Sequence, residues 1–256
     1  MKTTTFLTLV SISIAIFISS SSFSQTEPTD SVSLGGSIGI RGMWQTGNLN
    51  QVSLMPTGNL NLTAKNHFVQ VSGNYQFLIV EGFQVKNDLW SYGLYQYKPY
   101  NLFFPSASAV SGFAASYAID HSFVAGLGVG LNVIKNQGER YFQLHLHAGY
   151  LDFKFEDQIA LQSFAFSSLL RAKFPLKKGF VIGWELGSYH AMKETDFWGG
   201  DNLLQVMVRL NNNLSASVSH QTFYNHKAAP NIQNTNTQLL FGLHYSPRKI
   251  IHKSIK

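Results

Sequence analysis

FVQVSGNYQFLI, residues 68–79, decides the fold class because apolar and polar side chains alternate along it. On an extended chain Val69, Val71 and Tyr75 point to one face, and Gln70 and Gln76 point to the other. One face suits an apolar environment and the other suits water. The stretch therefore predicts a β-strand that lies between two such environments.

The same alternation returns along the rest of the chain. It predicts twelve strands, over Ser33–Gln45, Gln51–Thr63, His67–Val80, Asp88–Tyr97, Ala109–Ile119, Ser122–Ile134, Arg140–Leu151, Ile159–Lys173, Phe180–His190, Asn202–Leu210, Leu214–Phe223 and Thr235–Tyr245. Each run is near or above the roughly 9–11 residues that a tilted strand needs to cross a bilayer, and the number is even. Because no water reaches the bilayer core, every strand edge there has to be paired. The sequence predicts an all-β, antiparallel, up-and-down transmembrane barrel.

Aromatic residues near the ends of these strands favour the same fold class. Outer-membrane barrels carry girdles of aromatic side chains at both membrane interfaces. The candidates for such girdles are Trp44, Phe68, Trp90, Tyr97, Tyr100, Phe153, Phe180, Tyr189, Phe223 and Tyr245. A soluble β-sandwich, whose sheets also alternate, is the alternative, with these residues in its core.

The composition fits a chain that water does not fully surround. Charged residues make up 12% of the 256 residues, whereas soluble domains average about 25%. The net charge of +6 is not gathered into a nucleic-acid footprint, and the absence of cysteine excludes disulfides and an N-terminal lipidated cysteine. Since no proline-rich or charge-rich linker interrupts the chain, we expect a single folded domain.

The N-terminus has the features of a secretory signal. Lys2 precedes the apolar run Phe6–Ile18, and Ser22-Phe23-Ser24 forms a small-x-small site, so residues 1–24 are expected to be cleaved. An uncleaved anchor is the alternative, although the run is shorter than a spanning helix. We expect a polar spacer at 25–32, the barrel at 33–246 and a basic tail at 247–256.

The connections between the predicted strands suggest an orientation. The longer breaks His190–Asp201 and Tyr224–Asn234 fall at the end of the barrel opposite the N-terminus. Outer-membrane barrels have short periplasmic turns and longer extracellular loops, so we expect the N-terminus in the periplasm. Lys98–Ser108, a long predicted break on the periplasmic side, is an exception.

Short motifs resemble a known family. Gly36–Ile40 with Thr46-Gly47-Asn48, Gly126–Gly130 with Leu144–Tyr150, and Tyr224-Asn225-His226 with Gly242-Leu243-His244-Tyr245 resemble landmarks of the salt-induced outer-membrane protein family, defined as domain of unknown function 481. The resemblance implies an outer-membrane barrel, a link to salt stress and no catalytic residue. One departure is that Ser246–Lys256 extends beyond Tyr245, whereas such barrels commonly end on an aromatic residue.

Charged residues that point into the predicted barrel are the candidate site. Strand parity places Arg171, Lys173, Glu185 and Arg209 in the lumen, with Glu185 between Arg171 and Arg209. Such a set would form either a constriction that selects solutes or a structural plug of paired charges.

Other residues offer weaker chemistry. His145 and His147 share a face and could hold a metal, but a defined metal site needs three or four ligands, so none is predicted. Ser219-His220, Ser188 with His190 and Asn225-His226 are fragments of a hydrolase triad without its spacing, and no catalytic residue is predicted. Gly126, Gly128 and Gly130 lie within a strand pattern, so no dinucleotide or other cofactor is expected.

The leading hypothesis is a non-enzymatic outer-membrane barrel, either a narrow passive pore or a structural component of the stressed envelope. The alternatives are an outer-membrane enzyme acting on lipid or lipopolysaccharide, and a soluble periplasmic protein that binds an apolar ligand. The expected partners are outer-membrane lipids and lipopolysaccharide, the barrel assembly machinery and a small solute of unknown identity. Nucleic acid is not expected.

Overall fold

The computed structural model describes most of the residues that follow the expected signal peptide. The described residues are 31–45, 51–80, 83–137, 140–156, 160–176, 179–193, 197–227, 234–247 and 250–253. The expected signal peptide and spacer residues 25–30 lie outside these ranges. No helix within them is long and apolar enough to cross a membrane.

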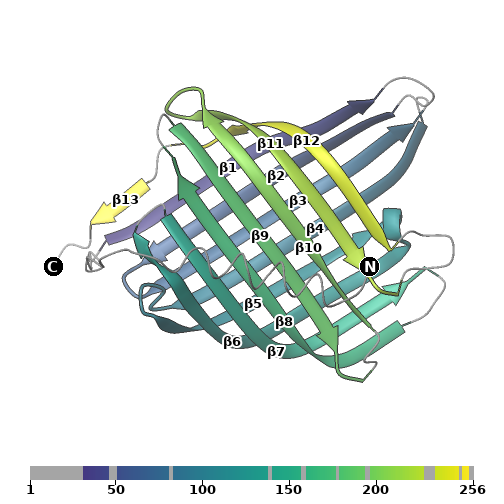
Figure 1. Ribbon diagram of the computed structural model, residues 1–256, viewed down its shortest axis with the longest axis horizontal. Coiled ribbons are helices and arrows are strands. Elements are labelled where there is room, and N and C mark those ends of the chain that lie inside the picture. Colours follow the sequence, from purple (N-terminus) through teal and green to yellow (C-terminus); the bar gives the residue numbers. More distant parts are fainter. Residues whose placement is uncertain are drawn as a thin grey trace.

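Twelve long strands of the described chain form one closed antiparallel barrel (Figure 1). They are β1 (Ser31–Gln45), β2 (Gln51–Ala64), β3 (His67–Val80), β4 (Phe83–Tyr97), β5 (Phe103–Ala114), β6 (Ile119–Gln137), β7 (Arg140–Phe155), β8 (Ala160–Pro175), β9 (Phe180–Ala191), β10 (Trp198–Arg209), β11 (Leu214–Asn225) and β12 (Thr235–Tyr245). Each strand pairs with its neighbour in sequence, and β12 returns to pair with β1. The fold class expected from the alternation is confirmed.

The fifth strand differs most from the prediction. It begins at Phe103 instead of Ala109, and a single 3-10 turn, η1 (Ala115–Tyr117), replaces its expected end. Pro105 and the small residues after it gave no strand signal in the sequence. The break predicted over Lys98–Ser108 is therefore only residues 98–102. This connection is shorter than predicted, but it is still the longest of those at its end of the barrel.

The two ends of the barrel have different connections. One end, here called the short-turn end, has the connections 65–66, 98–102, 138–139, 176–179 and 210–213. The opposite end, the long-loop end, has 46–50, 81–82, 115–118, 156–159, 192–197 and 226–234.

The seam that closes the barrel is short. Ile38–Gly42 pairs with Phe241–Tyr245 in five register pairs, whereas β1 and β2 share fourteen. A short strand, β13 (Ile250–Lys253), continues the seam by pairing with Ser31–Leu34. Part of the segment expected to be a basic tail is thus a strand.

Side-chain parity separates the two faces of the barrel wall. On β7 the outward Leu146 is 54% exposed, whereas the next residue, the inward His147, is 3% exposed. Large apolar residues such as Leu127 and Phe241 are exposed on the same outer face of other strands. An exposed apolar exterior on a closed barrel with no free edges is the arrangement that a bilayer requires.

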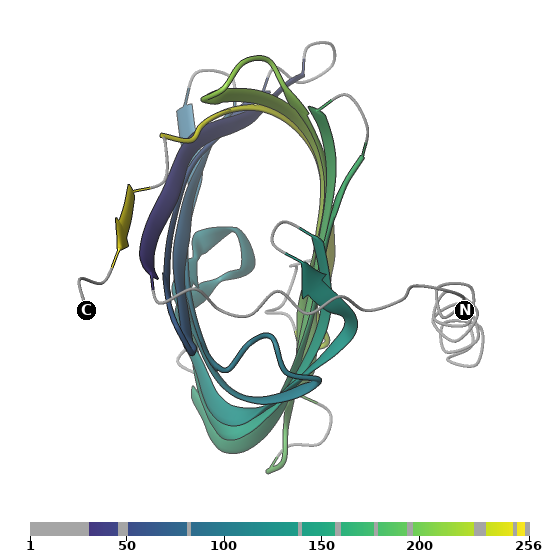
Figure 2. The same ribbon diagram turned by 90° about the vertical axis from the view of Figure 1, so that its left-hand side faces the viewer.

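The barrel is flattened rather than circular (Figure 2). Its two long walls are formed by β1–β4 and by β9–β12, and β5–β8 close the cross-section on one side. Side chains from facing walls therefore come close enough to meet inside the lumen.

Candidate functional site: the barrel lumen

An apolar cluster fills the half of the lumen towards the long-loop end. Its buried members are Ala114, Tyr117, Ile119, Leu151, Phe153, Phe155, Leu161, Ala165, Ala191 and Phe197. The Phe153 ring centroid lies 5.2 Å from that of Phe197 and 5.4 Å from that of Tyr189. These buried apolar side chains pack against one another as in the core of a soluble protein.

Several residues expected in the aromatic girdles belong to this cluster instead. Phe153 is buried in it, and Trp90, Tyr189 and Phe223 pack against it. Phe153, Tyr189 and Phe223 lie near strand ends as predicted, whereas Trp90 lies in the middle of β4, and all four side chains point inwards. Phe180 and Tyr245 are exposed, as girdle residues would be. The side chain of Trp44 lies outside the described residues.

The connection between β5 and β6 is tied into this half of the lumen. The backbone N–H of Ser116 donates to Asp88 Oδ1 at 3.0 Å, and the Ser116 hydroxyl donates to Oδ2 at 2.5 Å. Asp88 is a buried residue of β4. The pair holds η1 inside the barrel, where Tyr117 contacts Phe223 with ring centroids 4.3 Å apart.

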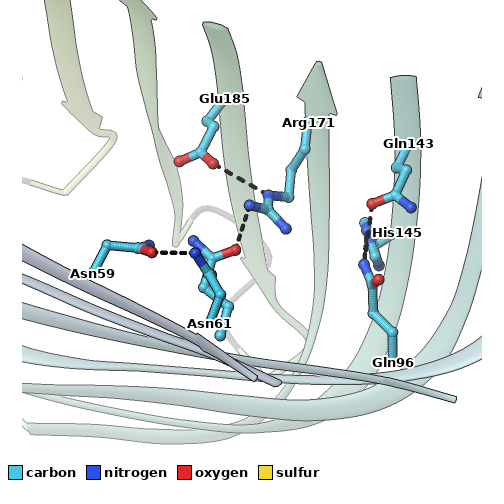
Figure 3. Close-up of polar contacts among 8 residues, drawn as sticks. Asn59, Asn61, Gln96, Gln143, His145, Arg171 and Glu185 are labelled. Atoms are coloured by element: carbon cyan, nitrogen blue, oxygen red, sulfur yellow. Dashed lines mark hydrogen bonds and ion pairs between the residues drawn. The ribbon is translucent and has the colours of Figure 1, made fainter. Parts of the chain in front are cut away.

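Towards the short-turn end the lumen is polar and is crossed by hydrogen bonds. Gln96 of β4 donates to Gln143 Oε1 at 3.1 Å and lies 3.3 Å from His145 Nε2, both on β7 (Figure 3). Gln143 in turn donates to Asn132 Oδ1 at 3.0 Å. These side chains are buried, and the contact of Gln96 with β7 joins two strands that are not paired with each other.

Arg171 forms a second connection across the lumen. Its Nε lies 3.2 Å from Glu185 Oε1 on the adjacent strand β9, and its Nη2 donates to Gln70 Oε1 of β3 at 2.5 Å (Figure 3). Asn59 and Asn61 of β2, joined by a 2.6 Å hydrogen bond, lie beside it. The Arg171 side chain is 6% exposed and that of Glu185 is 42% exposed, so there is space in the lumen next to the carboxylate.

The structure brings only part of the predicted charge set together. Glu185 pairs in register with Arg171 on one side and with Leu203, not Arg209, on the other. Arg209 is six residues further along β10 and is exposed, so the expectation that Glu185 lies between two arginines is wrong. Lys173 shares the lumen parity of Arg171 but has no ion-pair partner among the described residues.

The charged lumen residues that the sequence reasoning missed include Arg41 and Asp201, besides Asp88. Arg41 of β1 is 6% exposed, and its Nε and Nη1 have no hydrogen-bond partner within the described part of the chain. Gly242, its register partner, leaves room for the arginine stem. Asp201 lies at the start of β10 and lines the lumen. Alternation along the predicted strand Ser33–Gln45 would have placed Arg41 in the lumen, as it did Arg171 on its own strand. Asp201 was missed because the predicted strand began one residue later, at Asn202.

The paired histidines do face the lumen together. The rings of His145 and His147 are stacked with centroids 5.8 Å apart, and His145 also meets Phe104 edge-on. No group of three or more His, Cys, Asp or Glu side chains in the described residues is arranged to hold a metal. Gly130 faces His145 across the strand pair and leaves the space that the Phe104 ring occupies.

Serine–histidine contacts exist, but not those that the sequence suggested. Ser219 points inwards while His220 is exposed, and Ser188 bonds Ser168 at 2.7 Å on the outer face. His147 instead contacts Ser106 and Ser108 at 2.9 and 3.0 Å. Both nitrogens of His147 are thereby used by hydroxyl groups, so no carboxylate orients the ring as a hydrolase requires.

A small polar cavity lies between the polar and apolar halves. Its volume is about 30 Å³, and it is lined by residues of both long walls, among them Gln76, Tyr92 and Asp201. Gln76 crosses it to donate to Gln238 Oε1 at 2.9 Å. A cavity of this size holds one or two water molecules.

A family model matches residues 39–246, which begin within β1 and end just after β12. Its description is "Protein of unknown function, DUF481". The chain belongs to this family. The match covers the whole of the DUF481 barrel apart from the start of β1 and stops before β13, so the resemblance noted in the motifs is confirmed. No curated relative matches the chain.

Solved structures that align with the chain include two porins and a translocator domain. The DUF481 barrel aligns with the NanC porin with a TM-score of 0.48 and 7% identity, covering 85% of this chain and 100% of the porin. The KdgM porin aligns with a TM-score of 0.45 and 13% identity, covering 83% and 99%. The translocator domain of the autotransporter NalP from Neisseria meningitidis aligns with a TM-score of 0.38 and 11% identity, covering 94% and 95%.

Proposed function

We propose that this DUF481 protein is a narrow outer-membrane channel for small polar solutes that is closed in the conformation described. The observation that carries the proposal is in the polar half of the lumen, where the Glu185 carboxylate pairs with the buried Arg171 and its side chain is still 42% exposed. A barrel built only for structure has no need of space beside this carboxylate. Small barrels fill their interior completely with side chains.

The apolar cluster serves as the gate in this proposal. Hydrophobic constrictions close channels because water leaves an apolar neck. The cluster is partly built from η1, which belongs to a connection and is held by the Asp88–Ser116 contact. Displacing this connection would open the lumen without breaking a strand pair.

The proposed orientation places the N-terminus and the short-turn end in the periplasm of a double-membraned bacterium. The longest connections, 192–197 and 226–234, then face the outside, as extracellular loops do. We include a role under salt stress only because the family that the motifs resemble is named for induction by salt.

Conductance in a planar bilayer tests the proposal. We expect little conductance from the wild type and a clear increase from the double variant Phe153→Ala, Phe197→Ala, which removes two touching rings from the cluster. The matched control is Phe164→Ala, Phe166→Ala, whose rings also touch but lie on the lipid-facing side of β8. The control should conduct as the wild type does.

One result of this experiment would contradict the channel proposal. If the lumen variant folds and conducts no more than its control, the barrel is a structural component of the envelope and the channel proposal fails.

A further inference from the structure

The outer face of the barrel carries a groove of about 800 Å³ over β3–β8. Its floor is a row of small residues in register on three adjacent strands, Gly93, Ala109 and Ala125. Val71 and Tyr150 stand at the two ends of this row. Neighbouring strands lie 4.7–4.9 Å apart, so the three small residues span about 10 Å and Val71 lies about 19 Å from Tyr150.

The groove opens to the membrane interior and not to the lumen. Its walls include Leu127, Tyr150 and Phe164, outward residues that are 74%, 44% and 55% exposed. Side chains on this face of the barrel lie against the acyl chains of the bilayer. An open apolar groove on such a surface offers a place for an acyl chain.

Polar and aromatic side chains lead from the groove to the short-turn end. Tyr95 lines the groove, and its hydroxyl lies 2.9 Å from His67 Nδ1. The His67 ring is 5.3 Å from the Tyr97 ring, and Lys98 Nζ lies 5.4 Å from the centroid of that second ring. Aromatic residues and cations in this order mark the level of lipid headgroups.

Two of the cations at this end are carried by turns that are fixed to one another. The backbone N–H of Lys98 donates to the Asn66 carbonyl at 2.6 Å, which joins the turn 98–102 to the turn 65–66. Asn132 donates from inside the barrel to the Pro99 carbonyl at 2.8 Å. Lys65 and Lys98 are thus held in neighbouring turns at the same edge of the barrel.

We propose that the groove and these two turns bind one anionic glycerophospholipid, with an acyl chain in the groove and the phosphate group beside Lys65 and Lys98. Lysine near a membrane surface attracts anionic headgroups. The choice of a phospholipid rests on the orientation proposed above, because the periplasmic leaflet of an outer membrane consists of phospholipids. The groove itself does not depend on whether the lumen conducts.

Lipid retention tests the site. The full-length mature protein is reconstituted in vesicles of equal parts phosphatidylglycerol and phosphatidylcholine, extracted in mild detergent, and weighed by native mass spectrometry with its bound lipid. We expect the wild type to retain phosphatidylglycerol in preference to phosphatidylcholine. Ala109→Phe, which fills the groove, should lower total retained lipid severalfold. Ala216→Phe, an alanine on the outer face of β11, is the matched control and should change nothing.

A second variant separates the headgroup from the chain. Lys65→Gln, Lys98→Gln should abolish the preference for phosphatidylglycerol while total retained lipid stays near the wild-type level. This variant also tests the proposal if Ala109→Phe does not fold, as judged by the shift of the band between unboiled and boiled samples.

Three results would overturn the proposal. They are equal retention of the two lipids by the wild type, equal loss in Ala109→Phe and Ala216→Phe, and a wild-type dimer that Ala109→Phe dissociates, which would make the groove an interface between copies. None of these readouts measures conductance, so failure of the lipid-site proposal can be distinguished from failure of the channel proposal.

Discussion

Arg171 on β8 and Gln70 on β3 meet across the lumen, with Nη2 of the arginine 2.5 Å from Oε1 of the amide. The two residues are 101 positions apart in sequence and are not on paired strands. Their contact is possible because the barrel is flattened, and it fixes the guanidinium that also pairs with Glu185 (Figure 3).

Glu185→Gln should lower stability moderately and shift ion preference. The amide keeps an acceptor for Arg171 Nε but removes the charge. Hydrogen bonds to charged groups contribute about 1.5–3 kcal/mol, and we expect the low end because water reaches Glu185. Thermal unfolding, followed by the gel shift between unboiled and boiled samples, measures the loss of stability.

If the channel variant Phe153→Ala, Phe197→Ala conducts, adding Glu185→Gln to it should raise its preference for anions over cations.

The control for this prediction is Arg209→Gln. Sequence parity alone places Arg209 in the same network, whereas the register places it away from Glu185. An effect of Arg209→Gln as large as that of Glu185→Gln would contradict the register of β9 and β10.

Adjacent residues of β3 should respond oppositely to a new charge. Val71 is 53% exposed on the lipid face, and Ser72 points into the lumen. Arginine at the midplane of a barrel's outer face costs about 2–4 kcal/mol, whereas lumen positions offer polar partners. Val71→Arg should therefore reduce the yield of heat-modifiable protein much more than Ser72→Arg. Equal yields would show that the face assignment of β3 is wrong.

A disulfide can test the seam, since the chain has no cysteine of its own. Ile40 and Leu243 are register partners across β1 and β12. Paired residues lie about 4.5–5.5 Å apart at Cα, within the range for a disulfide. Ile40→Cys, Leu243→Cys should crosslink on mild oxidation, as judged on a non-reducing gel.

The offset pair Ile40→Cys, Leu239→Cys keeps the same face but moves one cysteine about 13 Å along β12. It should not crosslink. Efficient crosslinking of the offset pair would mean that the seam has a different register.

Two glycine-to-alanine substitutions should change stability in different ways, because one glycine is closely packed and the other is not. A Cβ on Gly130 would overlap the Phe104 ring, whereas a Cβ on Gly58 meets nothing within 4 Å. Gly130→Ala should destabilise the barrel by about 1–3 kcal/mol through overpacking. Gly58→Ala should be neutral or stabilise it by about 0.4–1 kcal/mol, because it restricts the unfolded chain. Urea unfolding in detergent compares the two, and a larger loss at Gly58 would contradict the packing.

The charged part of the site could be predicted only in part. The parity of β8 and β9 was enough to bring Arg171 and Glu185 to the same side of adjacent strands. It could not place Arg209, because a pair on adjacent strands also depends on register, and register depends on where each turn ends. The contact of Arg171 with Gln70 had no local signal, since it arises from the cross-section of the barrel.

The twelve long strands, their inward and outward faces and the closure of the barrel were determined by the sequence itself. Period-two alternation is a local property, and the bilayer leaves closure as its only solution. The tertiary structure alone decided the apolar cluster, the contacts across the lumen and the short seam extended by β13. Alternation along a strand predicts that Phe153 and Arg171 face inwards. The flattening of the barrel determines which side chains each of them contacts there.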